Sequence, residues 1–339
     1  MQKKTSVTMI LVLVFLVVAT LILFDTISDK KEFTKNSYAM SANISQTLTG
    51  KDAEKVSEEI HKRIVECENR EISFSISLSD IARVNSDKKA KVSDNTITYI
   101  KELLEFSKNC GGVFDITAGA LIREWAIGTD DFRVPDKNEI EKLLKTVGYD
   151  KVKVNGNTVE IGENTQLDLG AAGKGIACDE AKKIAEKSDL KKAVVSVGGS
   201  VMLWSENGEE EFTVGIRDPE GEAGDYMAKV KTGNCFVSTS GAYERFSADA
   251  DGKKYHHILS TKNGLPVENE VVSATVFCSS GILSDALSTA CFILGEKDSE
   301  ELLGKYNASA VFLLSDGSVK VSEKFDMDLK ITSSKYVLQ

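Results

Sequence analysis

Apolar residues recur every three or four positions in several segments of the chain, a spacing that places them on one face of a helix. In the first such segment, Val56, Ile60 and Ile64 share a face. Each segment follows a residue that favours a helix start or a glycine-rich turn. Helices are therefore predicted after Asp52, Asp94, Pro135, Gly175 and Ser280.

Short alternating or continuous apolar runs of strand length lie between the predicted helices. Single strands are predicted over Ala193–Trp204, Glu211–Arg217 and Ser273–Cys278. Hairpins are predicted where a turn pair interrupts such a run, at Asn155-Gly156, Asp251-Gly252 and Asp316-Gly317. Hairpins join antiparallel strands, so the predicted fold class is α+β: a mixed, largely antiparallel sheet with helices packed on it.

The N-terminus combines basic residues with a long apolar run. Lys3 and Lys4 precede the uncharged run Val7–Phe24, whose length is at the lower limit for crossing a membrane. No small-x-small cleavage site follows closely, so residues 1–25 are interpreted as an uncleaved anchor, with a removed signal segment as the alternative. The positive charges place the rest of the chain outside the cytoplasm, at the cell membrane. Residues 26–37 are then a tether, and 38–330 form one domain.

Composition narrows the classes of partner and site. The formal net charge of −10 and the pI near 5.1 exclude a basic face for phosphate backbones, so no nucleic-acid partner is expected. The 6 cysteines show neither a CxxC pair nor Cys/His spacing, which excludes a zinc site on pattern.

The predicted helix Gly281–Gly295 carries the first candidate for chemistry. Asp285 and Thr289 are four positions apart, so both side chains lie on the same side of the helix. A carboxylate and a hydroxyl in this arrangement suit a hard cation such as Mg²⁺. The alternative is that Asp285 only complements the helix dipole.

A glycine-rich segment between a short strand and a helix is the second candidate. Gln166–Asp179 contains three glycines and Lys174 immediately before the apolar helical positions. Such turns present N–H groups and a helix dipole to anions, although tight packing alone also requires glycine. Gly198-Gly199 likewise indicates a backbone that passes close to other atoms. Asp115 either faces a ligand or caps the turn after it, and His257 either transfers protons or is a satisfied strand histidine.

Five segments together resemble those of the ApbE family of FAD:protein FMN transferases, in order and approximate spacing. They are Gly112-Val-Phe-Asp-Ile-Thr, Leu167-Asp-Leu-Gly-Ala-Ala-Gly-Lys-Gly, Val197-Gly-Gly, Thr239-Ser-Gly-Ala-Tyr-Glu-Arg through His257-Ile-Leu, and Ser284-Asp-Ala-Leu-Ser-Thr. The similarity covers roughly residues 38–325. It implies an ApbE-like, T-fold-related architecture and a flavin transferase domain over 38–330.

The resemblance also implies a reaction: Mg²⁺-dependent transfer of FMN from FAD to a Thr or Ser hydroxyl of a target protein, with release of AMP. The implied metal ligands are Asp285, Thr289, Ser288 and the carbonyl of Gly173, where the family commonly has alanine. The implied catalytic residues are His257 and Asp285. The positions implied to contact FAD are Met40, Val113, Phe114, Asp115, Gly170, Lys174, Ile176, His257 and Ile258.

The implied partners are FAD, the membrane through the N-terminal helix, and an extracytoplasmic acceptor protein such as a membrane redox subunit. Two alternatives remain open at the level of sequence. One is an FAD-binding protein or an FAD pyrophosphatase that yields FMN and AMP without a protein acceptor. The other is a non-enzymatic binding module. Ser273-Ala274-Thr275 also faintly resembles an acceptor site for self-modification.

Overall fold

The computed structural model describes residues 31–222 and 224–339, and the predicted anchor over 1–25 lies outside this part. The helices of the described part are α2 (Ala53–Cys67), α3 (Asp80–Asp87), α4 (Asp94–Asn109), α5 (Gly119–Trp125), α6 (Lys137–Leu144), α7 (Gly170–Ala185), α8 (Gly281–Leu294) and α9 (Glu296–Lys305). A π-helical turn, Glu68–Ile72, and a 3₁₀ turn, Tyr149–Lys151, add to them.

A sheet of nine strands spans the described residues in the order β1-β2-β6-β7-β10-β13-β14-β15-β17. All neighbours in it are antiparallel except β15 and β17. Its strands are β1 (Glu32–Ala39), β2 (Ala42–Gly50), β6 (Leu190–Val197), β7 (Ser200–Ser205), β10 (Cys235–Gly241), β13 (Val271–Cys278), β14 (Ser309–Leu314), β15 (Ser318–Val321) and β17 (Val337–Leu338). The predicted α+β class is confirmed.

Three small sheets accompany the large one within the described residues. They are β3 (Lys89–Lys91) with β5 (Thr158–Glu160) and β4 (Lys153–Asn155), β16 (Asp328–Ile331) with β9 (Tyr226–Thr232) and β8 (Phe212–Arg217), and β11 (Phe246–Ala248) with β12 (Lys254–His256). The hairpins predicted at Asn155-Gly156, Asp251-Gly252 and Asp316-Gly317 are confirmed as β4–β5, β11–β12 and β14–β15.

Three predictions about the extent of elements differ from the structure. Residues 32–37, expected in the tether, belong to the edge strand β1, because every residue of β1 pairs in register with β2. The single strand predicted over Ala193–Trp204 is a hairpin, β6–β7, whose turn is Gly198-Gly199. Gly198 has a φ of +57°, which allows the chain to reverse there. At the other end, β17 extends the folded region beyond residue 330.

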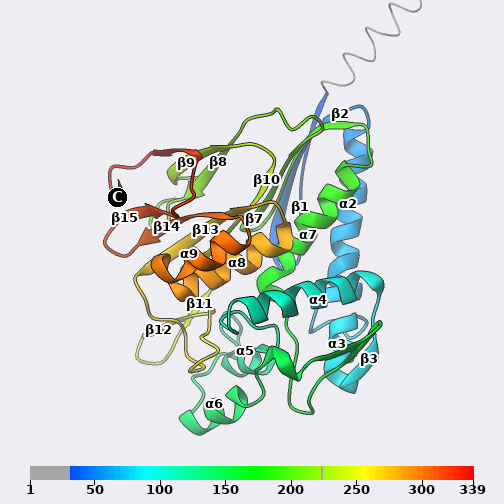
Figure 1. Ribbon diagram of the computed structural model, residues 1–339, viewed down its shortest axis with the longest axis vertical. Coiled ribbons are helices and arrows are strands. Elements are labelled where there is room, and N and C mark those ends of the chain that lie inside the picture. The colour runs from blue at the N-terminus through cyan, green and yellow to red at the C-terminus, as the bar shows by residue number, and fades with distance from the viewer. Residues whose placement is uncertain (1–30, 223) are drawn as a thin grey trace, which may run out of the picture.

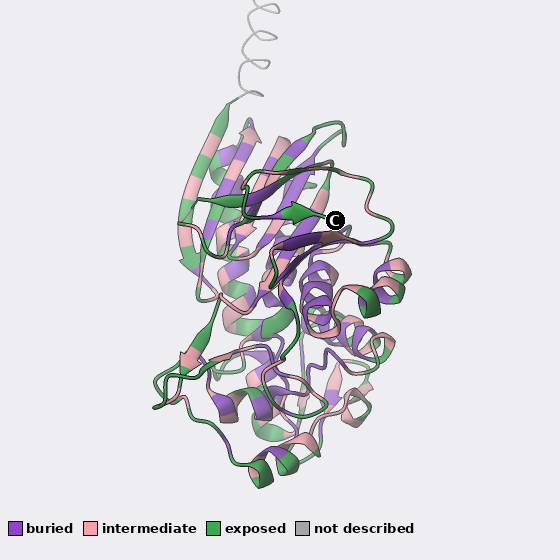
Figure 2. Ribbon diagram, turned by 90° about the vertical axis from the view of Figure 1, so that its left-hand side faces the viewer, coloured by how far each residue is buried: buried purple, intermediate pink, exposed green. Residues whose placement is uncertain are grey.

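Helices α2, α7 and α8 cover one face of the large sheet, and β8 and β9 lie on its other side (Figure 1). Helices α3 to α6 form a lower lobe below them. Burial follows this layering: α8 and the central strands are mostly buried, whereas β1 at the sheet edge alternates between exposed and partly exposed residues (Figure 2).

The start of α7 corrects the prediction of a glycine-rich turn before the helix. The helix begins at Gly170, so all three glycines lie within its first turns. Gly175 allows α7 to cross α8, since a Cβ there would lie 2.0 Å from the carbonyl oxygen of Gly281. Asp179 of α7 accepts hydrogen bonds from the N–H groups of Gly281 and Ile282 at 2.9 and 2.7 Å. Close packing therefore requires Gly175, and Asp179 caps α8.

Candidate active site

Asp285 lies at the crossing of α7 and α8, where its carboxylate accepts a hydrogen bond from the N–H of Gly175 at 2.9 Å. The side chain comes from the first turns of α8. Ser280 caps the N-terminus of this helix, because its hydroxyl accepts a hydrogen bond from the N–H of Leu283. Asp285 is 7 % exposed. Burial raises its pKa to about 6, and the nearby Lys174 ammonium and the Gly175 N–H oppose that shift. This carboxylate has one α7 backbone donor and a cation nearby.

The hydroxyl groups predicted beside Asp285 form a row between α8 and β10. Ser288 donates to the Asp285 carbonyl at 2.9 Å and lies 2.8 Å from the Ser240 hydroxyl. Thr289 lies 3.2 Å from the same Ser240 hydroxyl. Ser288 is fully buried, whereas Thr289 is partly exposed and is the more accessible of the two oxygens.

A second short chain of buried hydroxyls links α8, β10 and β7. The Ser238 hydroxyl donates to Ser200 at 3.1 Å and lies 2.8 Å from the Ser284 hydroxyl, and the Ser284 hydroxyl itself donates to the Gly281 carbonyl. All three serines are 1 % exposed or less. The Ser200 hydroxyl also interacts with the Asp285 carboxylate and opposes the rise of its pKa, so this row is connected to a charged group.

Lys174 and Glu244 form an ion pair next to Asp285, with Lys174 Nζ 3.8 Å from Glu244 Oε2. The two side chains are 31 and 27 % exposed. Burial raises the pKa of Glu244, and the Lys174 ammonium lowers it in part. The turn Gly198-Gly199 packs on this pair: a Cβ would lie 3.3 Å from Lys174 Cδ at Gly198 and 3.2 Å from Glu244 Oε1 at Gly199. The predicted close approach of the two glycines is confirmed.

His257 follows β12 and is held by Arg245, which immediately precedes β11. Its N–H donates to the Arg245 carbonyl at 3.2 Å, and its Nδ1 lies 3.1 Å from the same oxygen. A carbonyl only accepts, so the hydrogen-bond partner assigns the proton to Nδ1 and leaves Nε2 with a lone pair. Burial lowers the pKa of His257 to about 4, and the charges of Arg245 and Lys174 lower it further.

Met40 and Gly173 lie together on the side of α7 that faces the β1–β2 turn. A Cβ on Gly173 would lie 3.5 Å from Met40 Cε and 3.3 Å from Ile72 Cδ1. The Met40 backbone has a φ of +55° and its N–H donates to Glu68 at 2.9 Å. Gly170 is exposed at the start of α7, and its N–H donates to Asp168 at 2.7 Å.

The remaining predicted FAD contacts are buried residues, and their contact with FAD stays a prediction. Asp115 accepts hydrogen bonds from the N–H and hydroxyl of Thr117 at 2.9 and 2.6 Å and from the N–H of Tyr149 at 2.8 Å. Its carboxylate thus holds the turn that follows it, which was the alternative to a ligand contact. The other four side chains are buried in the hydrophobic core: Val113, Phe114, Ile176 and Ile258.

The candidate acceptor segment Ser273-Ala274-Thr275 lies within the buried strand β13. Ser273 and Thr275 are each 1 % exposed, so neither hydroxyl is accessible for self-modification. Among the described residues no three Asp, Glu, His or Cys side chains converge in a way that suits a metal ion. No helix in residues 31–222 or 224–339 combines the length and apolarity needed to cross a membrane.

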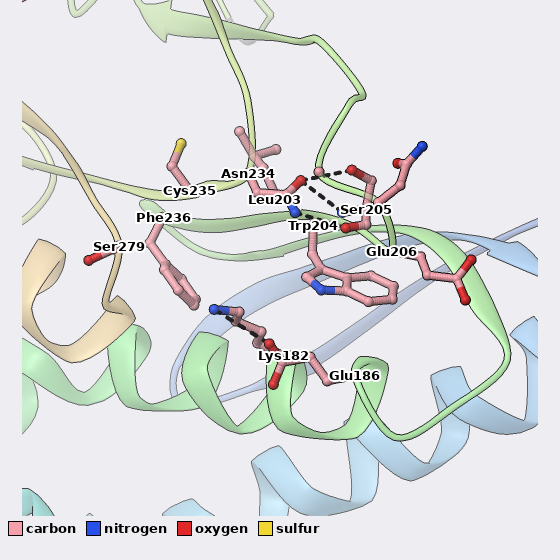
Figure 3. Close-up of a pocket in the computed structure, with 12 residues that line it drawn as sticks. Lys182, Glu186, Leu203, Trp204, Ser205, Glu206, Asn234, Cys235, Phe236 and Ser279 are labelled. Carbon is pink, nitrogen blue, oxygen red and sulfur yellow. Dashed lines mark hydrogen bonds and ion pairs between the residues drawn. The ribbon is translucent and has the colours of Figure 1, made fainter.

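A cavity of about 380 Å³ lies at the other end of α7 (Figure 3). Lys182 and Glu186 from the C-terminal end of the helix line it, together with Trp204 of β7 and Phe236 of β10. It contains none of the predicted site residues. The candidate site is therefore at the N-terminal end of α7, where Lys174 lies near Asp285.

The chain matches the model of the ApbE family over residues 38–313. The chain belongs to the ApbE family. It is similar to the FAD:protein FMN transferase of Treponema pallidum, with 32 % identity over 258 residues that cover 71 % of each chain. It is also similar to the FAD:protein FMN transferase of Klebsiella pneumoniae, with 30 % identity over 213 residues, 62 % of this chain and 66 % of that one.

Solved ApbE structures share the fold. The ApbE protein from Thermotoga maritima superposes with a TM-score of 0.78 at 29 % identity, covering 87 % of this chain and 98 % of that one. The apo flavinyl transferase ApbE from Pseudomonas stutzeri gives a TM-score of 0.75 at 22 % identity, covering 87 and 96 %. The predicted ApbE-like architecture is confirmed.

Three residues of this ApbE site were not predicted to act in it. Glu244 and Ser240 belong to the segment Thr239–Arg245, which was noted only as part of the family pattern. Asp179 was noted only as the end of the glycine-rich segment. Their placement depends on which strands and helices become neighbours in space. The sequence offered one signal for the cap of α8, the acidic residue Asp179 five positions after Lys174.

Proposed function

We propose that this chain transfers FMN from FAD to a Thr or Ser hydroxyl of an acceptor protein, with Mg²⁺ and with release of AMP. In this reaction the acceptor oxygen forms a bond to the FMN phosphorus. The bond from that phosphorus to the bridging oxygen breaks, and AMP leaves with that oxygen. The observation that supports the proposal is the α7–α8 crossing of an ApbE-family chain, which brings the Asp285 carboxylate next to the Gly175 N–H and the Lys174 ammonium.

The donor atoms near Asp285 fit Mg²⁺. Asp285 and Thr289 would hold the ion together with the Gly173 carbonyl, and all three supply the oxygen ligands that Mg²⁺ prefers. Asp285 is a buried carboxylate whose pKa is raised despite its neighbours, so a divalent cation would stabilise its charged form. Ser288 is already bonded to Ser240 and Asp285, which makes it a support for Thr289. When bound, Mg²⁺ supplies neutralisation of phosphate charge.

Lys174 and His257 supply the charge and the proton acceptor. The Lys174 ammonium is positioned by Glu244 and remains 31 % exposed, so it can contact a phosphate oxygen. The Nδ1–H of His257 donates to the Arg245 carbonyl, so Nε2 is the ring nitrogen that keeps a lone pair. With a pKa near 4 the imidazole is neutral at pH 7, the form that accepts the acceptor hydroxyl's proton.

The test is incubation of the full chain with FAD, Mg²⁺ and membrane proteins of the cell that makes it. We expect AMP release together with one or more proteins that gain the mass of an FMN phosphoester on Thr or Ser. Free FMN and AMP with no labelled protein would contradict transfer and favour hydrolysis of FAD. Asp285→Ala serves as the inactive control, and AMP release by that variant at the wild-type rate would contradict the metal site.

The cellular setting is part of the proposal. Residues 1–25 anchor the chain in the cell membrane, the domain faces away from the cytoplasm, and the acceptor is an extracytoplasmic membrane protein. The support is the apolar run Val7–Phe24 after Lys3 and Lys4. Protease added to spheroplasts is expected to degrade the domain, and its protection in intact spheroplasts would contradict this orientation.

A further inference from the structure

A groove of about 960 Å³ opens between the β11–β12 hairpin and the end of the large sheet. Phe246 and His256 form its wall on the hairpin, and Val271 and Val272 of β13 contribute to its floor. The opposite wall is the β14–β15 turn around Asp316. The floor is mainly apolar and the rim carries both acidic and basic side chains.

The groove lies beside the candidate active site along α8, because Phe292 of the groove is three positions after Thr289 on that helix. His256 lines the groove and the next residue, His257, lies in the site. On the facing loop, Tyr243 lines the groove and the next residue is Glu244. Beneath them, Phe292 of the floor lies three positions after Thr289 on α8 and contacts the His256 ring edge-to-face at 5.6 Å. A chain lying in the groove is therefore next to the turn of α8 that follows Thr289.

Phe246 is an exposed aromatic residue at the lip of this groove. Its side chain is 47 % exposed, and it pairs across the hairpin with His256. Lys254 Nζ lies 4.8 Å from the centre of its ring. No third strand pairs with β11 or β12 among the described residues, so the hairpin also presents unpaired backbone groups. Exposed aromatic rings and free strand edges are features of peptide-binding surfaces.

The rim charges favour a polypeptide over a nucleotide as the occupant. Lys254 and Lys335 are outnumbered by three acidic side chains on the rim, Glu220, Glu268 and Asp316. The excess of negative charge on the rim disfavours a dianionic pyrophosphate. The apolar floor accommodates an extended chain with apolar side chains. The predicted FAD contact Met40 lies elsewhere, in the β1–β2 turn, where it packs near Gly173.

We propose that this groove binds the extended segment of the acceptor protein that carries the modified Thr or Ser. The inference rests on the proposed transfer activity, because only an enzyme with a protein acceptor requires such a surface. Apolar side chains of the segment occupy the floor, Phe246 packs on one of them, and the hydroxyl reaches His257 at the open end.

The test uses a synthetic peptide that spans the FMN-labelled residue found in the membrane-protein experiment. Phe246→Ala is expected to raise the KM for this peptide about tenfold, the usual scale for losing an aromatic anchor. The KM for FAD and the slow release of AMP without peptide stay unchanged, since Phe246 lies outside the catalytic residues. Phe246→Tyr keeps the ring and the wild-type KM. Tyr38→Ala, at a 67 % exposed aromatic on β1, is the matched control.

A photo-crosslinking phenylalanine analogue at position 246 gives a second measurement. It is expected to label the peptide, whereas the same analogue at position 38 does not. An unchanged peptide KM in Phe246→Ala, or a raised KM for FAD, would overturn the inference, as would labelling of the intact acceptor without any modification of the peptide. If the wild-type chain labels no protein at all, the transferase proposal fails and the groove assignment fails with it.

Discussion

Burial moves the pKa values of Asp285 and His257 in opposite directions, because it disfavours the charged form of each group. The pKa of the Asp285 carboxyl rises to about 6, and the pKa of the His257 imidazole falls to about 4. Near pH 7 the two groups are therefore an anion and a neutral base. These are the forms that a cation site and a proton acceptor require.

Replacement of Asp285 by Asn is expected to remove both the metal response and the activity. The amide keeps the size of the side chain but loses the charge that holds Mg²⁺. AMP release should fall about 100-fold or more, a loss typical of removing a charge-stabilising group. The rise in Tm on adding Mg²⁺ should disappear, and in the wild type this rise should shrink below pH 6. Asp130→Asn, at an exposed loop position, should change neither measurement.

His257 is expected to titrate near pH 4, measured by NMR of the imidazole in the free chain. Between pH 6.5 and about 4 the unfolded chain binds more protons than the folded one, so stability falls as the pH is lowered through this window. His257→Gln should lose that part of the pH dependence of the unfolding free energy. A titration at or above pH 6.5 would show that the ring is not desolvated.

The residues of the candidate site differed in how far the sequence alone predicted their positions. Asp285 and Thr289 were predicted because both lie on one helix, whose period fixes their relative position. Glu244 was not predicted, since its approach to Lys174 depends on the register of β10 against β7 and on the Gly198-Gly199 turn. The role of Asp115 was ambiguous, because the sequence pattern of a carboxylate before a short helix fits both a cap and a ligand contact.

At the scale of elements, each of the helices α7 and α8 has a carboxylate that accepts hydrogen bonds from the backbone of the other. Asp179 of α7 caps the N-terminus of α8, and Asp285 of α8 accepts from the backbone of α7. The crossing is close because Gly175 and Gly281 meet without side chains. The position of the candidate metal site is thus set by helix packing, which fixes Asp285 against the turn that holds Lys174.

Gly175→Ala is expected to destabilise the chain by about 3 kcal/mol or more, because the added methyl overlaps the Gly281 backbone and forces the helices apart. Gly304→Ala in α9 is the matched control, since its Cβ would meet only the Lys324 ammonium at 3.9 Å. That change should raise stability by about 0.5–1 kcal/mol through helix propensity. Urea unfolding of both variants measures the difference, and equal stabilities would contradict the crossing.

The sequence predicted the elements whose boundaries depend on nearby residues. It did not predict those whose boundaries depend on contacts with distant parts of the chain. Turn pairs such as Asn155-Gly156 and Asp316-Gly317 identify hairpins because two-residue turns need their backbone freedom. The start of α7 was misplaced, since the glycines that normally interrupt a helix are required here by the neighbour α8. Gly198-Gly199 was assigned to the middle of a strand because the flanking residues are apolar on both sides.

At the scale of the whole molecule, the fold depends on packing and not on covalent crosslinks. All six cysteines are free, and four of them are buried: Cys67, Cys178, Cys278 and Cys291. The sheet and its helices enclose three large apolar cores, whose residues run along the chain from Ala39 to Tyr336. A domain with cores of this extent is stable without disulfides.

Reducing agent is therefore expected to leave the Tm of the chain unchanged. The measurement is thermal unfolding with and without dithiothreitol under otherwise equal conditions. Mass spectrometry after alkylation of the unfolded protein should find all six thiols modified in both samples. A fall in Tm on reduction would indicate a disulfide and contradict the packing that places these thiols apart.

The serine and threonine hydroxyls between α8 and β10 have a consequence for how the site changes charge. Each hydroxyl can rotate, and in the Ser238–Ser284 pair either oxygen can be the donor, so this hydrogen bond can reverse its direction without moving a heavy atom. Ser240 and Ser288 can do the same next to Asp285. The protein can thus reorient dipoles around Asp285 as it gains or loses a proton or a cation, while the backbone of the site stays fixed.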